Sequence, residues 1–267
     1  MFTISSAATV STLALVLAGA IAPAFATPIL TNRYSFTTNA NDSVGGANLT
    51  LVGATTVSGG QLRLPGGFHT NYAAATGASL TRLSNTVNNA RALTIEMWLT
   101  DGQAGASYSK VFMAGNGRAK FINVTPRKFG STNSQEISIN GEVDNFASIV
   151  PTNVPFYFAA SFDSTTNLMT MHSGAVGGAL VSKSAPMGGY ALSSLGPLAY
   201  FTLGNSAFDD PDFKGSIDEM RVWNGAFSTR NAAYNFAAGP SSVPEPSSIL
   251  LMGLGLAVFA VRRKRKA

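Results

Sequence analysis

The sequence predicts an all-β fold, a two-layer antiparallel sandwich, between residues 27 and 240. Three observations predict it: short apolar stretches that alternate with period two, Asn-Gly turns between such stretches, and no convincing amphipathic helix before about Ser228. Alternation places one face of each strand on a core and leaves the other face open. Many short strands separated by turn residues are typical of antiparallel sandwiches.

The clearest strands cover residues 93–99 and 156–162, where apolar residues occupy every second position. A further strand is predicted near residues 217–222. The alternation assigns eight side chains to the core: Leu93, Ile95, Met97, Phe156, Phe158, Phe162, Met220 and Val222.

Two hairpins are indicated by Asn-Gly pairs. Residues 111–114 and 119–122 flank Asn116-Gly117. In the same way, residues 137–139 and 142–143 flank Asn140-Gly141. Asn-Gly is the strongest short hairpin signal, because both central residues of a type I′ turn need a positive φ.

Residues 1–26 have the pattern of a secretory signal peptide. An apolar stretch from Ala7 to Ala22 precedes Ala24-Phe25-Ala26, which fits the small-x-small cleavage pattern. Cleavage after Ala26 makes Thr27 the first mature residue, so we expect an exported protein.

Residues 241–267 contain a stiff motif, an apolar run and a basic stop, in that order. The motif is Pro244, Glu245 and Pro246, the apolar run covers residues 249–261, and the basic cluster is Arg262, Arg263, Lys264, Arg265 and Lys266. A helix of this apolar run is about 20 Å long, which is short of the hydrocarbon core of about 30 Å. The run therefore suits transient membrane contact during sorting better than permanent anchorage.

This tail resembles the PEP-CTERM sorting signal of Gram-negative bacteria. The resemblance implies processing by an exosortase, a membrane-embedded cysteine protease, and delivery to the cell surface or its exopolysaccharide. Until processing, the basic cluster would hold the C-terminus in the cytoplasm and tether the protein to the inner membrane. An ordinary single-span anchor is the alternative.

The charge distribution argues against a nucleic-acid partner. The net charge is +5, but five of the 18 Lys and Arg residues form the terminal cluster, and the other 13 balance 13 Asp and Glu residues. The basic residues of the neutral body are scattered, whereas phosphate binding needs them gathered in one stripe. Because the chain has no Cys, disulfide and thiolate chemistry are excluded.

The body also resembles the laminin G-like, concanavalin A-like jelly-roll family. Residues 34–51 look like its first two strands with an Asp-containing loop, residues 93–99 (Leu-Thr-Ile-Glu-Met-Trp-Leu) look like its central strand, and residues 203–228 look like its closing strand and short helix. The resemblance implies a jelly roll over residues 27–240. Members of the superfamily include both binding modules and glycoside hydrolases.

No catalytic constellation is visible in the sequence. Hydrolases of this superfamily place carboxylates at alternate positions of one strand, so that both face the substrate. Asp218 and Glu219 are adjacent, and adjacent residues of a strand project to opposite faces. The remaining candidates fall beside turns or stand alone and receive no catalytic role: Glu142/Asp144, Asp210/Asp212, His69 and His172, the last expected to flank a turn. We therefore expect no enzyme.

Trp98 and Trp223 are the two tryptophans, and each lies on the more polar face of its strand. An exposed indole on a sheet face can stack against a sugar, so these residues form the candidate ligand face. In the alternative, which we favour, loops cover both indoles and Glu96 pairs with Arg221 between neighbouring strands.

The family resemblance further implies a calcium ion near Asp42 and Asp218. In these jelly rolls the first and last strands are antiparallel neighbours, which would bring the two carboxylates together. Nearby carboxylates repel unless a cation lies between them, and Ca²⁺ accepts six to eight oxygens. In the alternative, Asp42 caps a turn through backbone amides and Asp218 accepts backbone hydrogen bonds.

The leading interpretation is an exported, non-catalytic surface protein with a glycan or protein ligand. Its partners would be an exosortase, exopolysaccharide or another surface ligand and, transiently, the membrane through residues 249–261. A carbohydrate-active enzyme and a purely structural matrix protein are the alternatives.

Overall fold

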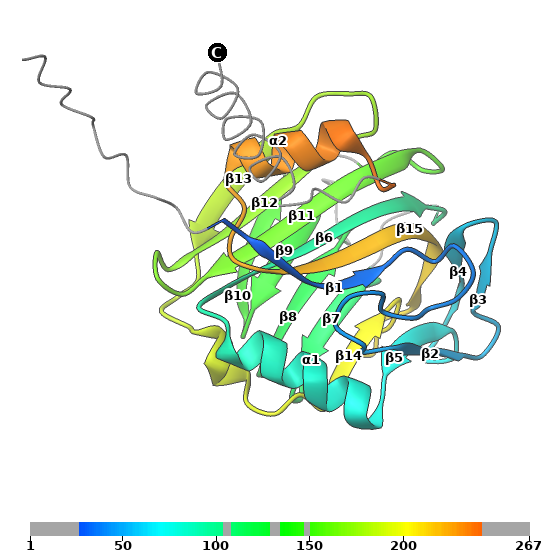
Figure 1. Cartoon of the computed structure of the whole chain (residues 1–267), viewed down its shortest axis with the longest axis horizontal. Coiled ribbons are helices and arrows are strands. Elements are labelled where there is room, and N and C mark those ends of the chain that lie inside the picture. Colours follow the sequence, from blue (N-terminus) through cyan, green and yellow to red (C-terminus); the bar gives the residue numbers. More distant parts are fainter. Residues whose placement is uncertain (1–26, 104–107, 129–133, 147–149, 242–267) are drawn as a thin grey trace, which may run out of the picture.

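The computed structural model describes residues 27–103, 108–128, 134–146 and 150–241. Within these residues the strands form two antiparallel sheets that pack face to face (Figure 1). The predicted two-layer sandwich is thus confirmed. The predicted signal peptide, Pro-Glu-Pro motif, apolar C-terminal helix and basic cluster lie outside the described residues. Among the described residues, no helix has the length and apolar character needed to cross a membrane.

Sheet A, the first layer, has the strand order β13-β12-β11-β6-β15-β4-β3, and β1 also pairs with β15. Its strands are β1 (Ile29–Tyr34), β3 (Thr56–Ser58), β4 (Gln61–Gly67), β6 (Ala92–Asp101), β11 (Pro155–Asp163), β12 (Leu168–Ala175), β13 (Val181–Pro186) and β15 (Asp212–Asn224).

Sheet B, the second layer, has the order β10-β9-β8-β7-β14-β5-β2. Its strands are β2 (Leu49–Val52), β5 (Tyr72–Ala75), β7 (Phe112–Gly115), β8 (Phe121–Thr125), β9 (Gln135–Ile139), β10 (Glu142–Phe146) and β14 (Tyr200–Leu203). A short 3₁₀ helix, η1 (Leu192–Leu195), precedes β14.

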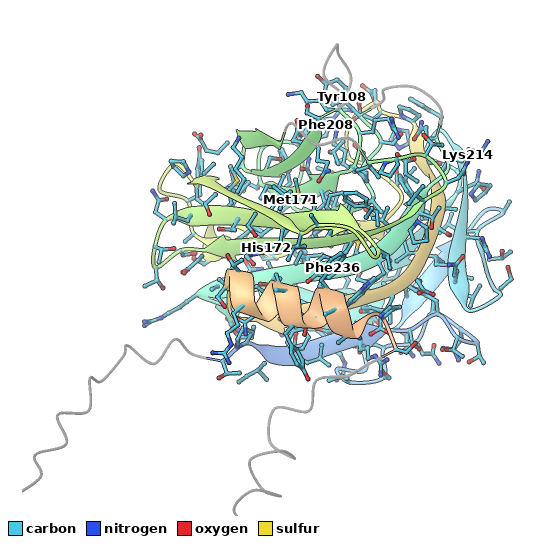
Figure 2. The ribbon with its side chains drawn as sticks, turned by 90° about the horizontal axis from the view of Figure 1, so that it is seen from above. Tyr108, Met171, His172, Phe208, Lys214 and Phe236 are labelled. Carbon is cyan, nitrogen blue, oxygen red and sulfur yellow. The ribbon has the colours of Figure 1, made fainter. Side chains whose placement is uncertain are left out.

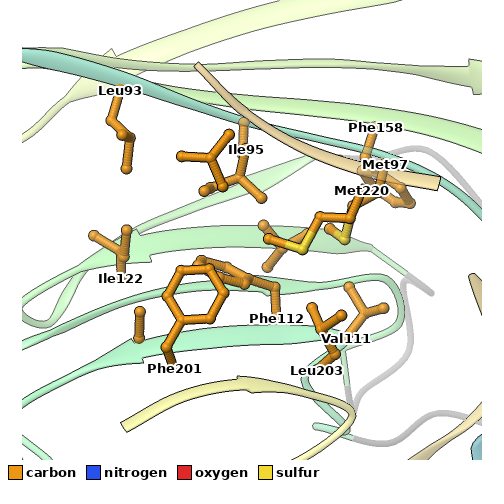
Figure 3. Close-up of a cluster of buried hydrophobic side chains, with 14 of the residues drawn as sticks. Leu93, Ile95, Met97, Val111, Phe112, Ile122, Phe158, Phe201, Leu203 and Met220 are labelled. Atoms are coloured by element: carbon orange, nitrogen blue, oxygen red, sulfur yellow. The ribbon is translucent and has the colours of Figure 1, made fainter. Parts of the chain in front are cut away.

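The hydrophobic core lies between the two sheets (Figure 3). All eight side chains that the alternation assigns to it are at most 2% exposed. Sheet A contributes Leu93, Ile95, Met97, Phe158 and Met220 in this view, and sheet B contributes Phe112, Ile122, Phe201 and Leu203. The predicted assignment of these eight side chains to the core is therefore confirmed.

Both predicted hairpins form, with different turns. Ile139 pairs with Glu142, so Asn140 and Gly141 make a two-residue turn with φ values of 49° and 95°. This is the geometry that Asn-Gly favours. β7 and β8 pair as predicted, but residues 116–120 connect them, because Gly115 pairs with Phe121.

One helix contradicts the expectation that no helix precedes Ser228. α1 (Gly77–Asn89) lies between β5 and β6 and buries Leu83 and Val87. Ser, Thr and Asn supply more than half of its residues, and these residues compete with helical hydrogen bonds. Packing of Leu83 and Val87 on the sandwich therefore decides its conformation, rather than intrinsic propensity.

The second helix, α2 (Thr229–Ala238), lies on the outer face of sheet A (Figures 1 and 2). Ser228 caps it, with its hydroxyl accepting the amide of Asn231 at 3.2 Å. A second hydrophobic cluster fills the space beneath the helix: Trp98, Tyr157, Ala159, Trp223, Phe227 and Ala232, with Phe236 packed against them. α2 thus closes one part of the outer face of sheet A.

Candidate functional site

The candidate ligand face formed by Trp98 and Trp223 is closed. Each tryptophan is 3% exposed, because α2 and the segment before it cover this part of sheet A. Trp98 packs against Tyr157 with ring centroids 5.0 Å apart, and Trp223 packs against Phe227 at 5.3 Å. A sugar ring cannot reach these buried indoles. The prediction of a ligand face is therefore wrong. The favoured alternative, in which both indoles are covered, is found, but helix α2 covers them where loops were expected.

Glu96 lies fully buried beneath α2. Tyr157 Oη donates to its Oε1 and Trp223 Nε1 donates to its Oε2, each at 2.9 Å, and Asn235 of α2 also donates to it. Arg221 Nη1 lies 3.6 Å from Oε2, which is the expected pairing across β6 and β15. Burial raises the pKa of Glu96, and the charge of Arg221 and the three donors oppose that rise.

Arg221 extends this network toward the edge of sheet A. Its guanidinium lies over the Trp98 ring, 4.7 Å from the centroid, and its Nε donates to Glu219. Arg33 of β1 donates to the same carboxylate twice, at 2.9 and 3.0 Å. The carbonyl of Pro240 accepts from Arg221 Nη2 at 2.7 Å. Paired and hydrogen-bonded in this way, the buried charges hold β1, β6, β15 and the end of the domain together.

A β-bulge in β15 changes the face that Asp218 occupies. Ile217 and Glu219 oppose consecutive residues of β6, so Asp218 is the extra residue. Ile217 before the bulge and Met220 after it both belong to the core. Asp218 and Glu219 therefore both lie on the outer face of sheet A. The expectation of opposite faces is wrong, because a bulge interrupts the alternation of a strand.

The two carboxylates still do not present a hydrolytic pair. Glu219 is 2% exposed and its oxygens accept from Arg33 and Arg221. Asp218 is half-buried and hydrogen-bonded to Gln61, and burial together with the charge of Glu219 raises the pKa of Asp218. Of the two, Asp218 alone is within reach of a ligand.

Asp42 is surrounded by donors, which does not fit a calcium ligand. Its two oxygens accept five N–H groups at 2.6–3.0 Å, from the side chain of Asn32 and the backbones of Arg33, Val44, Gly45 and Ala47. Asp218 interacts with Gln61 and Glu219 instead. Among the described residues, no group of three or more His, Asp or Glu side chains could hold a metal. Calcium binding stays a prediction, which melting curves of calcium-stripped protein with and without calcium test.

Two residues expected beside turns are buried polar groups. Asp212 begins β15 and accepts the backbone amides of residues 69–71 at 2.8–3.1 Å. His172 lies inside β12, with Nδ1 2.7 Å from the Ser182 hydroxyl and Nε2 3.3 Å from the Phe227 carbonyl oxygen. Burial lowers the pKa of His172. Both residues are 1% exposed, and their hydrogen bonds organise neighbouring segments.

Beyond the part that α2 covers, the outer face of sheet A opens into a groove of about 590 Å³. Four of its lining residues form one row across the strands, since Thr56 pairs with Arg63, Arg63 with Ser216, and Ser216 with Thr100. Lys214 and Asn153 also line it. Figure 2 shows Lys214 at the side of the molecule, away from α2. The groove therefore offers hydroxyl, amide and basic groups at the surface.

The sequence interpretation missed these groove residues. The stretch Gln61-Leu62-Arg63-Leu64-Pro65 alternates, which identifies Arg63 as an outer residue. β3 and β4 are neighbours in the sequence, but β15 and β6 are distant from them and from each other, and the pairing of β15 with both β4 and β6 brings the row together. Alternation within one strand carries no information about this pairing.

Comparison with known proteins identifies the family. Residues 69–233 match the family model described as the Concanavalin A-like lectin/glucanases superfamily. The chain belongs to this superfamily. β1 and β4 precede the match, but both pair with β15 inside it, so the concanavalin A-like sandwich of this chain begins at β1.

The concanavalin A-like domain is followed by a sorting signal. Residues 242–265 match the PEP-CTERM protein-sorting motif. The protein is thus exported and sorted to the cell envelope. No curated protein sequence matches the chain.

Three solved structures share the concanavalin A-like fold. Domain 4 of AbnA, a GH43 extracellular arabinanase from Geobacillus stearothermophilus in complex with arabinotriose, is 19% identical with a TM-score of 0.59, covering 79% of this chain and 98% of that one. Botulinum neurotoxin type C is 13% identical (TM-score 0.55; 79% of this chain, 51% of that one). The leech intramolecular trans-sialidase is 13% identical (TM-score 0.52; 67% and 27%). At these identities the likeness establishes the fold alone.

Proposed function

We propose that this protein is a non-catalytic glycan-binding module of the cell surface or exopolysaccharide matrix, and that the groove on sheet A is its binding site. The observation that carries the proposal is the division of one sheet face. α2 closes the aromatic part, whereas the part lined by Thr56, Ser216 and Thr100 stays open. Hydroxyl and amide groups on a rigid sheet suit the many hydroxyls of a glycan.

The relatives support a carbohydrate as the ligand class. The same fold holds arabinotriose in the arabinanase domain. The sorting motif supports a location where such a ligand is abundant, since an exosortase of a Gram-negative bacterium would deliver the protein from the inner membrane to the surface.

Binding of the purified full chain to a glycan array, followed by calorimetry on the best glycan, tests the proposal. Thr56→Ala combined with Thr100→Ala removes two hydroxyls of the groove and should weaken binding by about tenfold. Thr81→Ala on the exposed side of α1 is the matched control and should leave affinity unchanged. Wild-type affinity in the double variant would remove the groove as the site.

A hydrolase is the rival function, because the bulge places Asp218 on the same face as the groove. The hydrogen bonds that Arg33 and Arg221 donate to Glu219 argue against a hydrolase, because they occupy the second carboxylate of the pair. Incubating the purified chain with the bound glycan and measuring released reducing sugar separates the two. Release that disappears in Asp218→Asn favours the hydrolase, and intact glycan favours the binding module.

A further inference from the structure

Two basic side chains stand out in the groove. Arg63 and Lys214 are both exposed, and no acidic residue is among the residues that line the groove. The ion pairs within the described chain use other cations, namely Arg33, Lys110, Arg118, Arg127, Lys128 and Arg221. Because the body of the protein is neutral, two such cations at one groove are a local feature rather than a consequence of general charge.

The sheet holds these two cations close enough to act on one ligand. Arg63 of β4 opposes Ser216 of β15, and Lys214 lies two residues before Ser216. Diagonal neighbours of this kind lie about 7–8 Å apart in an antiparallel pair. Lys214 and Ser216 are two residues apart on one strand, so their side chains lie on the same face. Because Arg63 lies opposite Ser216, the side chains of Arg63 and Lys214 both project from the outer face of sheet A. A single sugar unit or a pair of units can therefore contact both.

The nearby carboxylates are engaged elsewhere, with one exception. Asp212 accepts three backbone amides, and Asp101 pairs with Arg127 at 3.1 Å. Glu219 is held by two arginines. Asp218, bonded to Gln61, is the acidic group that remains on the outer face near the groove.

We infer that the groove takes an acidic glycan, a polysaccharide whose sugars carry carboxylates. This rests on the proposed function and names the ligand class of the same site. The planar guanidinium of Arg63 matches a carboxylate in a two-pronged hydrogen bond, and the Lys214 ammonium adds a second positive charge. The hydroxyls of Thr56 and Thr100 are then left for the hydroxyls of the sugar. Asp218 does not line the groove but lies two residues after Ser216 in β15, and its negative charge repels the same ligand.

The test compares ligands and variants by calorimetry on the purified full chain. Oligomers of galacturonic acid are the acidic probe, neutral galactose oligomers of equal length are the neutral probe, and polyaspartate is a polyanion without sugar. We expect galacturonic acid oligomers to bind best and to lose affinity several-fold between 50 and 500 mM salt. Arg63→Ala and Lys214→Ala should each weaken this binding by about 3- to 10-fold. Asp218→Asn should strengthen it, and Arg82→Ala on α1 is the matched control.

Three results would overturn the inference, and they differ from each other. Equal binding of neutral oligomers, insensitive to salt but lost with the groove hydroxyls, refutes the acidic ligand and leaves the proposed function standing. If polyaspartate binds as tightly as the galacturonic acid oligomers, the groove attracts negative charge without recognising sugar, and this result refutes a glycan as the ligand. Absence of binding to every glycan refutes the proposed function together with the inference.

Discussion

The Asp42 carboxylate accepts hydrogen bonds from five N–H groups, and these bonds determine how the stability that it contributes depends on pH. Burial alone would raise the pKa of Asp42, but the amides of Ala47, Arg33 and Val44 and the side chain of Asn32 outweigh it, so the net pKa lies below the ordinary 3.8. The unfolded chain therefore takes up the proton at a higher pH than the folded protein does. The stability that Asp42 contributes is complete above about pH 4 and is lost as the pH falls through the folded-state pKa.

We predict that Asp42→Asn lowers the free energy of unfolding by about 1–3 kcal/mol at pH 7. The amide NH₂ of Asn would face N–H donors that the carboxylate now satisfies. The difference from wild type should shrink as the pH falls below 4, because wild-type Asp42 then becomes neutral as well. Urea unfolding at pH 7, 4 and 3 measures it, and a difference that stays constant over this range would contradict the assignment.

At the scale of single residues, the sequence predicts which face of a strand a side chain occupies better than it predicts which other segments cover that face. Alternation placed Trp98 and Trp223 correctly outside the main core, but it cannot reveal that α2 covers them. Likewise, nothing in the pair Asp218-Glu219 indicates a bulge, since the extra residue is defined by its partner strand. Burial of an outer face and breaks in register both depend on contacts that are distant in the sequence.

At the scale of elements, β11 shows how well alternation performs when a strand is long. Its nine residues pair with β6 over their whole length, and the phenylalanines all face the core. α1 shows the opposite case, because its polar composition hides the spacing of Leu83 and Val87. Tertiary packing overrides weak local propensity there.

We predict that Phe158→Ala in β11 lowers the free energy of unfolding by about 3–5 kcal/mol, since it removes a fully buried ring and leaves a cavity. Val181→Ala in β13 is the control: its side chain is 54% exposed, so a change within about 0.5 kcal/mol is expected. Chemical denaturation of both variants measures the contrast. Equal stability of the two variants would show that the β11 register is wrong.

At the scale of the whole molecule, the sandwich and the sorting signal form separate parts of one chain. The described fold extends to Pro240, whose carbonyl accepts from Arg221, and the PEP-CTERM match begins at residue 242. The described contacts of the sandwich all lie before residue 242, so removal of the tail leaves these contacts in place. The sequence alone predicted both parts, because each has a local pattern: alternation in the strands, and a fixed order of motif, apolar run and basic cluster in the tail.

We predict that the tail is removed at or near Pro244-Glu245-Pro246. The apolar run of residues 249–261 is too short for comfortable permanent anchorage. Two prolines in the preceding motif restrict its backbone, and a protease could bind such a stiff segment in an extended form. In an exosortase-competent host, the intact mass of the surface-extracted protein should lack residues 262–266. The same chain in a host without exosortase is the control and should keep the full tail. A surface species that retains the basic cluster in the competent host would establish the single-span anchor instead, since a processed substrate cannot carry it.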